Sequence, residues 1–190
     1  MSKIATVAVL SLVLAACSNS GLSMSEYGER LDEIRVTYEP RAETAWIEYL
    51  QVPQPTLEDL EILIGREVAV RAEIEEALRA LDPPEEIQDL HATLADWVTE
   101  LRLAGEGLLG RAGTAAEWDE FFASAEYQTF GATLIGGAAV CNEFQARLDA
   151  TAAREAFADS AWIPGEMKEV VEAVIGCDTI PNDVDEIFRR

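Results

Sequence analysis

The chain of 190 residues carries 36 acidic and 14 basic side chains, which gives a formal net charge of −22. A surface of this sign repels phosphate backbones and anionic headgroups, and it argues against nucleic-acid binding through a basic patch. Hydrophobic residues still make up 49% of the chain and recur at helical spacing. We therefore expect a folded domain with an apolar core, not a disordered acidic chain.

The first sixteen residues have the features of an export signal, and Cys17 follows them. Lys3 precedes an uncharged stretch, 4–16, that is too short to span a bilayer, because a spanning helix needs about 20 apolar residues. The end of this stretch, Leu14-Ala15-Ala16-Cys17, resembles the lipobox of bacterial lipoproteins. An ordinary cleaved signal with a chance cysteine is the alternative interpretation, because small residues precede the cleavage point in both cases.

The resemblance to bacterial lipoproteins implies a set of modifications at Cys17. A diacylglyceryl group is transferred to its sulfur, the chain is cleaved before it, and the new amino terminus receives a fatty acid such as palmitate. Two or three acyl chains hold a protein firmly at a membrane, since each buried methylene contributes about 0.8 kcal/mol. The implied protein is extracytoplasmic and anchored to the bacterial membrane, with a signal peptide (1–16), a flexible tether (17–22) and one helical-bundle domain (23–190).

A first helix is predicted from Ser23, which has capping-box spacing with Glu26. The apolar residues that follow recur every three or four positions, at Tyr27, Leu31, Ile34 and Tyr38. Pro40 interrupts this pattern because it lacks an amide proton and crowds the preceding turn. The pattern resumes at Ala42 and continues to Leu50. We expect a kink at Pro40 or a break into two helices.

The turn 52–55 leads to Thr56, which is predicted to cap a second helix that ends at 82–84. Pro84 suits the start of a third helix, whose apolar face comprises Ile87, Leu90, Leu94, Trp97, Val98 and Leu101. Glycines follow this face at positions 105, 107, 110 and 113. Because glycine disfavours helix, we expect the third helix to end among them.

Residues 114–117 have the spacing of another capping box, and an aromatic cluster that we assign to the core follows at Trp118, Phe121, Phe122, Tyr127 and Phe130. A fourth main helix is predicted to continue to Leu148, with a smaller helix at 166–175. No stretch alternates with period two for long enough to predict a sheet. The predicted fold is all-α: an up-down bundle of about four main helices plus a smaller C-terminal helix.

Two cysteines, Cys141 and Cys177, remain as an even pair once Cys17 is lipid-modified. An extracytoplasmic compartment permits disulfides, so we predict a bond between them that joins the C-terminal helix to the bundle. A loop of this length would contribute about 3–4 kcal/mol in the loop-entropy model. Two buried free thiols are the alternative.

A weaker resemblance links residues 57–177 to small secreted helical bacterial lipoproteins of uncharacterised function. It depends on short motifs: 81–84 with His91 downstream, then 141–145 and the late Cys177. This resemblance implies no activity that could be transferred to the chain.

No catalytic set is recognisable in the sequence. His91 is the only histidine, which excludes metal centres with several histidine ligands, and Gln88 stands where a ferritin-like site requires glutamate. No Gly-x-Ser-x-Gly elbow occurs, and 105–107 is followed by leucine and not by the lysine of a phosphate loop. We expect His91 at the edge of the third apolar face, hydrogen-bonded or exposed, and neither an enzyme, a cofactor nor a metal site.

Two features leave a binding role open. Trp46, Trp97 and Trp118 could line a cleft for a small ligand, although core packing explains most such aromatics. The densest oxygen cluster, Asp178, Asn182, Asp183, Asp185 and Glu186, could hold calcium weakly, although a solvated acidic tail fits its spacing better.

The sequence therefore predicts a lipid-anchored, non-enzymatic binding or interaction module of the cell envelope. Its expected partners are the membrane, through lipid on Cys17, and an envelope protein or small ligand of unknown identity. The first alternative is a small-ligand-binding lipoprotein with an aromatic-lined pocket. The second is an acidic surface protein that binds divalent cations.

Overall fold

A computed structural model of the chain describes residues 21–152 and Phe188. The described residues are helical and contain no strand, so the all-α prediction is confirmed. The elements in chain order are α1 (Met24–Leu50), α2 (Leu57–Arg79), the 3-10 turn η1 (Glu85–Ile87), α3 (Gln88–Ala112), α4 (Trp118–Phe122) and α5 (Ala125–Ala152).

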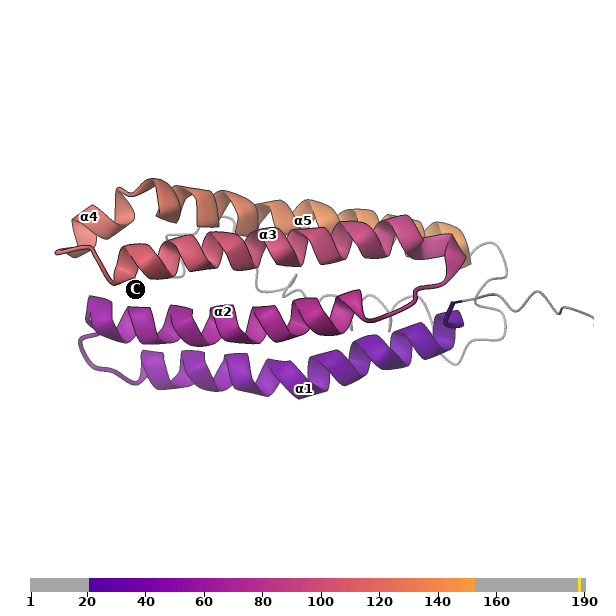
Figure 1. Cartoon of the computed structure of the whole chain (residues 1–190), viewed down its shortest axis with the longest axis horizontal. Coiled ribbons are helices and arrows are strands. Elements are labelled where there is room, and N and C mark those ends of the chain that lie inside the picture. The colour runs from indigo at the N-terminus through magenta and orange to yellow at the C-terminus, as the bar shows by residue number, and fades with distance from the viewer. Residues whose placement is uncertain (1–20, 153–187, 189–190) are drawn as a thin grey trace, which may run out of the picture.

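The four long helices form the predicted bundle. Figure 1 shows α1, α2, α3 and α5 side by side in that order, with the short α4 at one end. The ion pairs Arg41–Glu73 and Glu48–Arg66 show that α1 and α2 are antiparallel, because the later residue of α1 meets the earlier residue of α2. The predicted helix at 166–175 lies outside the described residues.

Two helix starts follow from side-chain caps that the sequence predicts. The Ser23 hydroxyl accepts the amide of Glu26 at 3.3 Å, and the Glu26 carboxylate accepts the amide of Ser23 at 2.9 Å. Thr56 and Asp59 make the same reciprocal bonds at the start of α2. Each cap satisfies amide donors that a helix start leaves without intrahelical partners, which fixes where α1 and α2 begin.

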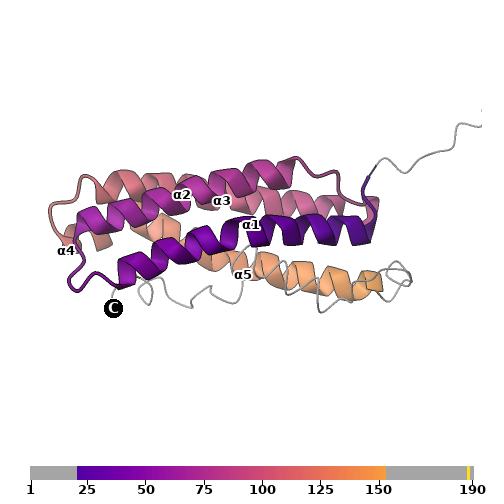
Figure 2. The ribbon, with the colours of Figure 1, turned by 90° about the horizontal axis from the view of Figure 1, so that it is seen from below.

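Pro40 lies inside α1 without ending it. Because proline has no amide proton, the carbonyl of Val36 loses its intrahelical partner, but Val36 is exposed and water can reach this turn. Figure 2 shows that the axis of α1 changes direction partway along the helix. The kink is therefore the correct alternative, and the predicted break into two helices is wrong.

Of the four glycines at which we expected the third helix to end, only Gly113 ends it. The helix continues through Gly105, Gly107 and Gly110 to Ala112 and is capped by Gly113. A Cβ at Gly105 would lie 3.0 Å from Cγ2 of Val68, so the missing side chain lets α2 approach α3 closely. Packing between the two helices offsets the low helix propensity of glycine, a tertiary effect that local sequence does not show.

The capping box predicted at 114–117 is also wrong. The Thr114 hydroxyl donates to the carbonyl of Gly110 at 3.0 Å and so closes the end of α3. Glu117 is the N-cap of α4 without a side-chain bond. The carboxylate of Glu120 instead accepts the Ala116 amide at 2.8 Å and pairs with Arg111 at 2.6 Å. The start of α4 is thus fixed from the end of α3.

Aromatic side chains fill the core at the α4 end, as predicted. Phe121 and Tyr127 are fully buried with ring centroids 5.5 Å apart, and Trp118 stacks on Phe122 at 5.6 Å. Phe188 is also buried and extends this group, because its ring lies near the rings of Trp46, Tyr127 and Phe130. Phe188 therefore contributes to the core between α1 and α5.

Candidate functional site

The predicted covalent sites lie mostly outside the described residues. Cys17 and Cys177 fall there, as does the acidic cluster at 178–186. Cys141 belongs to α5. The lipid anchor, the Cys141–Cys177 disulfide and the calcium alternative remain predictions from sequence.

The three tryptophans proposed for a ligand pocket do not converge on one hollow. The Nε1–H group of Trp97 donates to the carbonyl of Thr133 at 3.0 Å, which joins α3 to α5. Trp46 packs against Phe188 at one end of the aromatic core, whereas Trp118 packs in the α4 group. Each ring has a packing role in the described part of the chain.

A shallow hollow of about 150 Å³ lies between α1 and α2 near the turn that joins them. Its lining residues are Ala45, Glu48, Tyr49, Val52, Asp59, Ile62, Leu63 and Arg66. Burial holds the pKa of the Tyr49 hydroxyl above its ordinary value, with a smaller contribution from Asp59. The Glu48–Arg66 ion pair lies across the two helices, so the hollow is bordered by groups that already pair α1 with α2.

His91 lies inside the bundle and not at its surface. Its side chain is 7% exposed, and its Nδ1 atom is 2.9 Å from the hydroxyl of Tyr27, which is fully buried. The two rings meet edge to face with centroids 5.7 Å apart. Of the two environments predicted for His91, the hydrogen-bonded one is correct.

The surroundings of His91 favour the neutral form of its ring. Its neighbours are the Tyr27 hydroxyl, within hydrogen-bond distance of Nδ1, and the backbone of Leu78. Burial lowers the pKa of His91 and the charge of Arg79 lowers it further, while the Leu78 bond opposes both. The ring is neutral at physiological pH.

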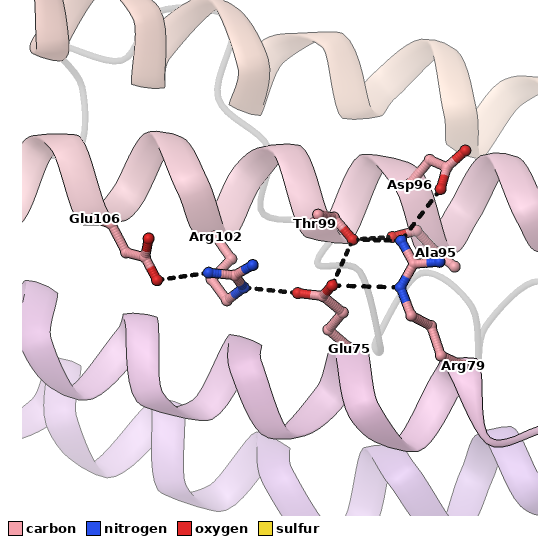
Figure 3. Close-up of polar contacts among 7 residues, drawn as sticks. All are labelled: Glu75, Arg79, Ala95, Asp96, Thr99, Arg102 and Glu106. Atoms are coloured by element: carbon pink, nitrogen blue, oxygen red, sulfur yellow. Dashed lines mark hydrogen bonds and ion pairs between the residues drawn. The ribbon is translucent and has the colours of Figure 1, made fainter.

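Glu75 is the hub of a polar network between α2 and α3 (Figure 3). Its carboxylate accepts from Nε of Arg102 at 2.6 Å, from the Thr99 hydroxyl at 2.8 Å and from Nε of Arg79 at 3.3 Å. The Glu75 side chain is 16% exposed and that of Arg102 is 19% exposed. These bonds, with that of Arg102 first, lower the pKa of Glu75. The network joins two helices and leaves Glu75 ionised.

A second charged pair, Glu67 and Arg71, lies on the face of α2 that also carries the buried side chains Leu60, Ile64 and Leu78. Oε2 of Glu67 is 3.1 Å from Arg71, whereas its Oε1 atom is buried without a hydrogen-bond partner. Sequence reasoning passed over this pair because it looked only for apolar residues on that face. Charges at such a position oppose stability unless they are fully paired.

The described part of the chain contains neither a cluster of metal-ligating side chains nor a membrane-spanning helix. None of its His, Cys, Asp or Glu side chains form a group of three or more that could hold a metal ion. None of the helices in this part of the chain combines the length and apolar character needed to cross a membrane.

No protein-family model matches the chain, and no curated protein or solved structure matches it.

Proposed function

We propose that this protein is a lipid-anchored domain on the outer side of a bacterial membrane, where it acts as a non-enzymatic binding or interaction module. The observation that carries the proposal is the segment Leu14-Ala15-Ala16-Cys17 at the end of a short uncharged stretch behind Lys3. A signal of this length cannot span a bilayer, so lasting attachment requires lipid on the cysteine.

The start of the bundle fits an anchor at Cys17. The amide of Leu22 donates to the carbonyl of Asp82 at 2.9 Å, so the first described residues are fixed beside the connection between α2 and α3. Four residues of chain reach at most about 14 Å. In an anchored protein, the end of the bundle where α1 begins therefore faces the membrane. The turn between α1 and α2 lies about 40 Å from that end, because α1 has 27 residues.

The polar side chains of the bundle support an interaction module more than an enzyme. His91, the residue best suited to proton transfer at neutral pH, is enclosed by Tyr27 and Leu78. Glu75 bonds groups of α2 and α3. Both residues hold helices together in the described structure, which is a structural use of groups that catalysis would need free.

Substitution of the anchor residue tests the proposal. We expect Cys17→Ser to block processing or to move the protein from the membrane fraction to the soluble fraction, because the serine hydroxyl offers no thiol for lipid transfer. The double variant Cys141→Ser and Cys177→Ser is the matched control, since it removes the predicted disulfide pair without leaving an unpaired thiol and keeps Cys17; it should stay with the membranes. Normal processing and membrane association of Cys17→Ser would contradict the lipid anchor.

A further inference from the structure

We propose that Tyr27, His91 and the Leu78 carbonyl form a pH-sensitive fastening, which we call the His91 hydrogen-bond chain. It holds the start of α1 against α2 and α3 at neutral pH and weakens in mild acid. This inference goes beyond the proposed function and does not depend on the lipid anchor. It rests on three residues from three helices.

The His91 hydrogen-bond chain lies where the polypeptide enters the bundle. Tyr27 is in the first turn of α1, and the neighbouring Gly21 lies against Pro83, whose carbonyl oxygen would be 2.7 Å from a Cβ at that glycine. A side chain at Gly21 would not fit this approach. The bonds of Tyr27 and Leu22 thus hold the same end of α1, one through α3 and the other through the α2–α3 connection.

Protonation of His91 is incompatible with its hydrogen bond to Tyr27. The fastening requires the neutral tautomer in which Nδ1 accepts from the Tyr27 hydroxyl and the other ring nitrogen carries the proton. A second proton on Nδ1 places two donors face to face, so the hydroxyl must turn away and find another acceptor inside the core. Tyr27 does not escape this conflict by ionising, because burial raises its pKa far above the physiological range.

The charges around His91 also oppose its protonation. Tyr27 faces the ring from α1 and is neutral, while Arg79 faces it from α2 and is positive. On η1 and α3 the positions one turn away from His91 are Ile87, Gln88, Leu94 and Ala95, and none is charged. No carboxylate among the described residues contributes to the His91 shift, so an imidazolium there would be buried beside a like charge.

The direction of the pH effect follows from the lowered pKa of His91. When the start of α1 opens, the ring meets water and its pKa returns toward the ordinary value of 6.5. The open form therefore binds more protons than the closed form below that pH, and acid favours opening. Above that pH both forms hold a neutral ring, and the fastening is at full strength.

The single histidine of the chain makes the ring directly measurable. We expect the imidazole signals of the intact protein to titrate below 6.5 in NMR spectra, with the Nδ1 atom unprotonated at neutral pH. A midpoint at or above 6.5, or a neutral ring that carries its proton on Nδ1, would overturn the proposal. This measurement needs no substitution and so cannot fail through misfolding.

Hydrogen exchange tests whether the ring controls the helix. The amides of Tyr27 and Leu31 should lose protection between about pH 7.5 and about pH 5.5, after correction for intrinsic exchange, by up to about tenfold, because one pH unit below 6.5 separates the two forms by at most that factor. Amides near Leu63 in α2 should change less. His91→Gln keeps a donor and an acceptor without titrating, and we expect it to abolish the pH dependence.

A second variant serves as a matched control. In His91→Gln combined with Gln88→His, the only histidine moves to an exposed position one turn earlier on α3. Its midpoint should return toward the ordinary value, and the protection of α1 should stay independent of pH. If α1 loses the same protection in acid with and without His91, or if His91 titrates low while α1 keeps its protection, the proposal is wrong.

Discussion

Substitution of Glu75 measures how much the network between α2 and α3 stabilises the bundle. Glu75→Gln removes the negative charge that faces Arg102, whose guanidinium keeps a bond to Glu106 at 2.5 Å. Loss of a charge-assisted bond between mostly buried groups costs about 1.5–3 kcal/mol, and the remaining Glu106 bond reduces this to about 1–2 kcal/mol. In a domain of this size we expect Tm to fall by about 2–8 °C.

The assay is urea unfolding at neutral pH of Glu75→Gln, Arg102→Met and the double variant, which isolates the energy that couples the two side chains. The exposed pair Arg30–Glu33 provides the control, and Glu33→Gln should leave the unfolding midpoint unchanged. Additive effects of the Glu75 and Arg102 substitutions would refute the reasoning, because independent residues show no coupling.

The same variant has an expected pH signature. The pKa of Glu75 is lowered, chiefly by the bond from Arg102, so the unfolded chain binds this proton more readily than the folded one. The stabilisation is complete above the ordinary value of 4.5 and is lost as pH falls through the folded pKa. The difference between the wild type and Glu75→Gln should therefore shrink in acid. A constant difference would contradict the assignment of the stabilisation to an ionised Glu75.

Three further substitutions test the packing, all by the free energy of unfolding. Glu67→Leu alone should destabilise because it leaves the mostly buried Arg71, whose side chain is 25% exposed, without its partner. Addition of Arg71→Leu should restore or raise stability, by about 1–4 kcal/mol above the single variant; a double variant no better than the single would contradict this. Gly105→Leu should cost about 1–3 kcal/mol through overpacking against α2, and Val68→Ala should recover part of the loss; no recovery would place the strain elsewhere. Phe188→Ala should cost about 3–5 kcal/mol by leaving a cavity between α1 and α5, and an unchanged midpoint would show that this ring is not packed in solution.

The helix boundaries that were predictable are those set by neighbours in sequence. Ser23 and Thr56 predicted the starts of α1 and α2 correctly. Each cap and its partner are three residues apart, so the interaction that fixes the helix start is local in sequence. Gly105 was expected to weaken the third helix. It lies inside α3 instead, because Val68 of α2 packs against the space that a side chain would fill. Thr114 misled the prediction because its hydroxyl bonds backward into α3 and not forward into α4. Where the cause was tertiary, the local pattern gave the wrong boundary.

The polar sites were less predictable than the fold for the same reason. His91 and Tyr27 are 64 residues apart in sequence, and nothing near either residue indicates that they meet. Glu67 and Arg71 were missed because the prediction used only the spacing of apolar residues. Polar residues between them on the same face do not disturb that spacing. A pair of opposite charges four residues apart in the middle of a buried face is a signal that could have found this site.

The anchor at Cys17 is tested most directly by the intact mass of the protein purified from bacterial membranes. We expect a chain that begins at Cys17 and carries the added mass of a diacylglyceryl group and a fatty acid, both lost from the protein when its first residues are removed by protease. A chain that begins upstream of Cys17, or one that begins there without fatty acid, would contradict the lipid-anchored function.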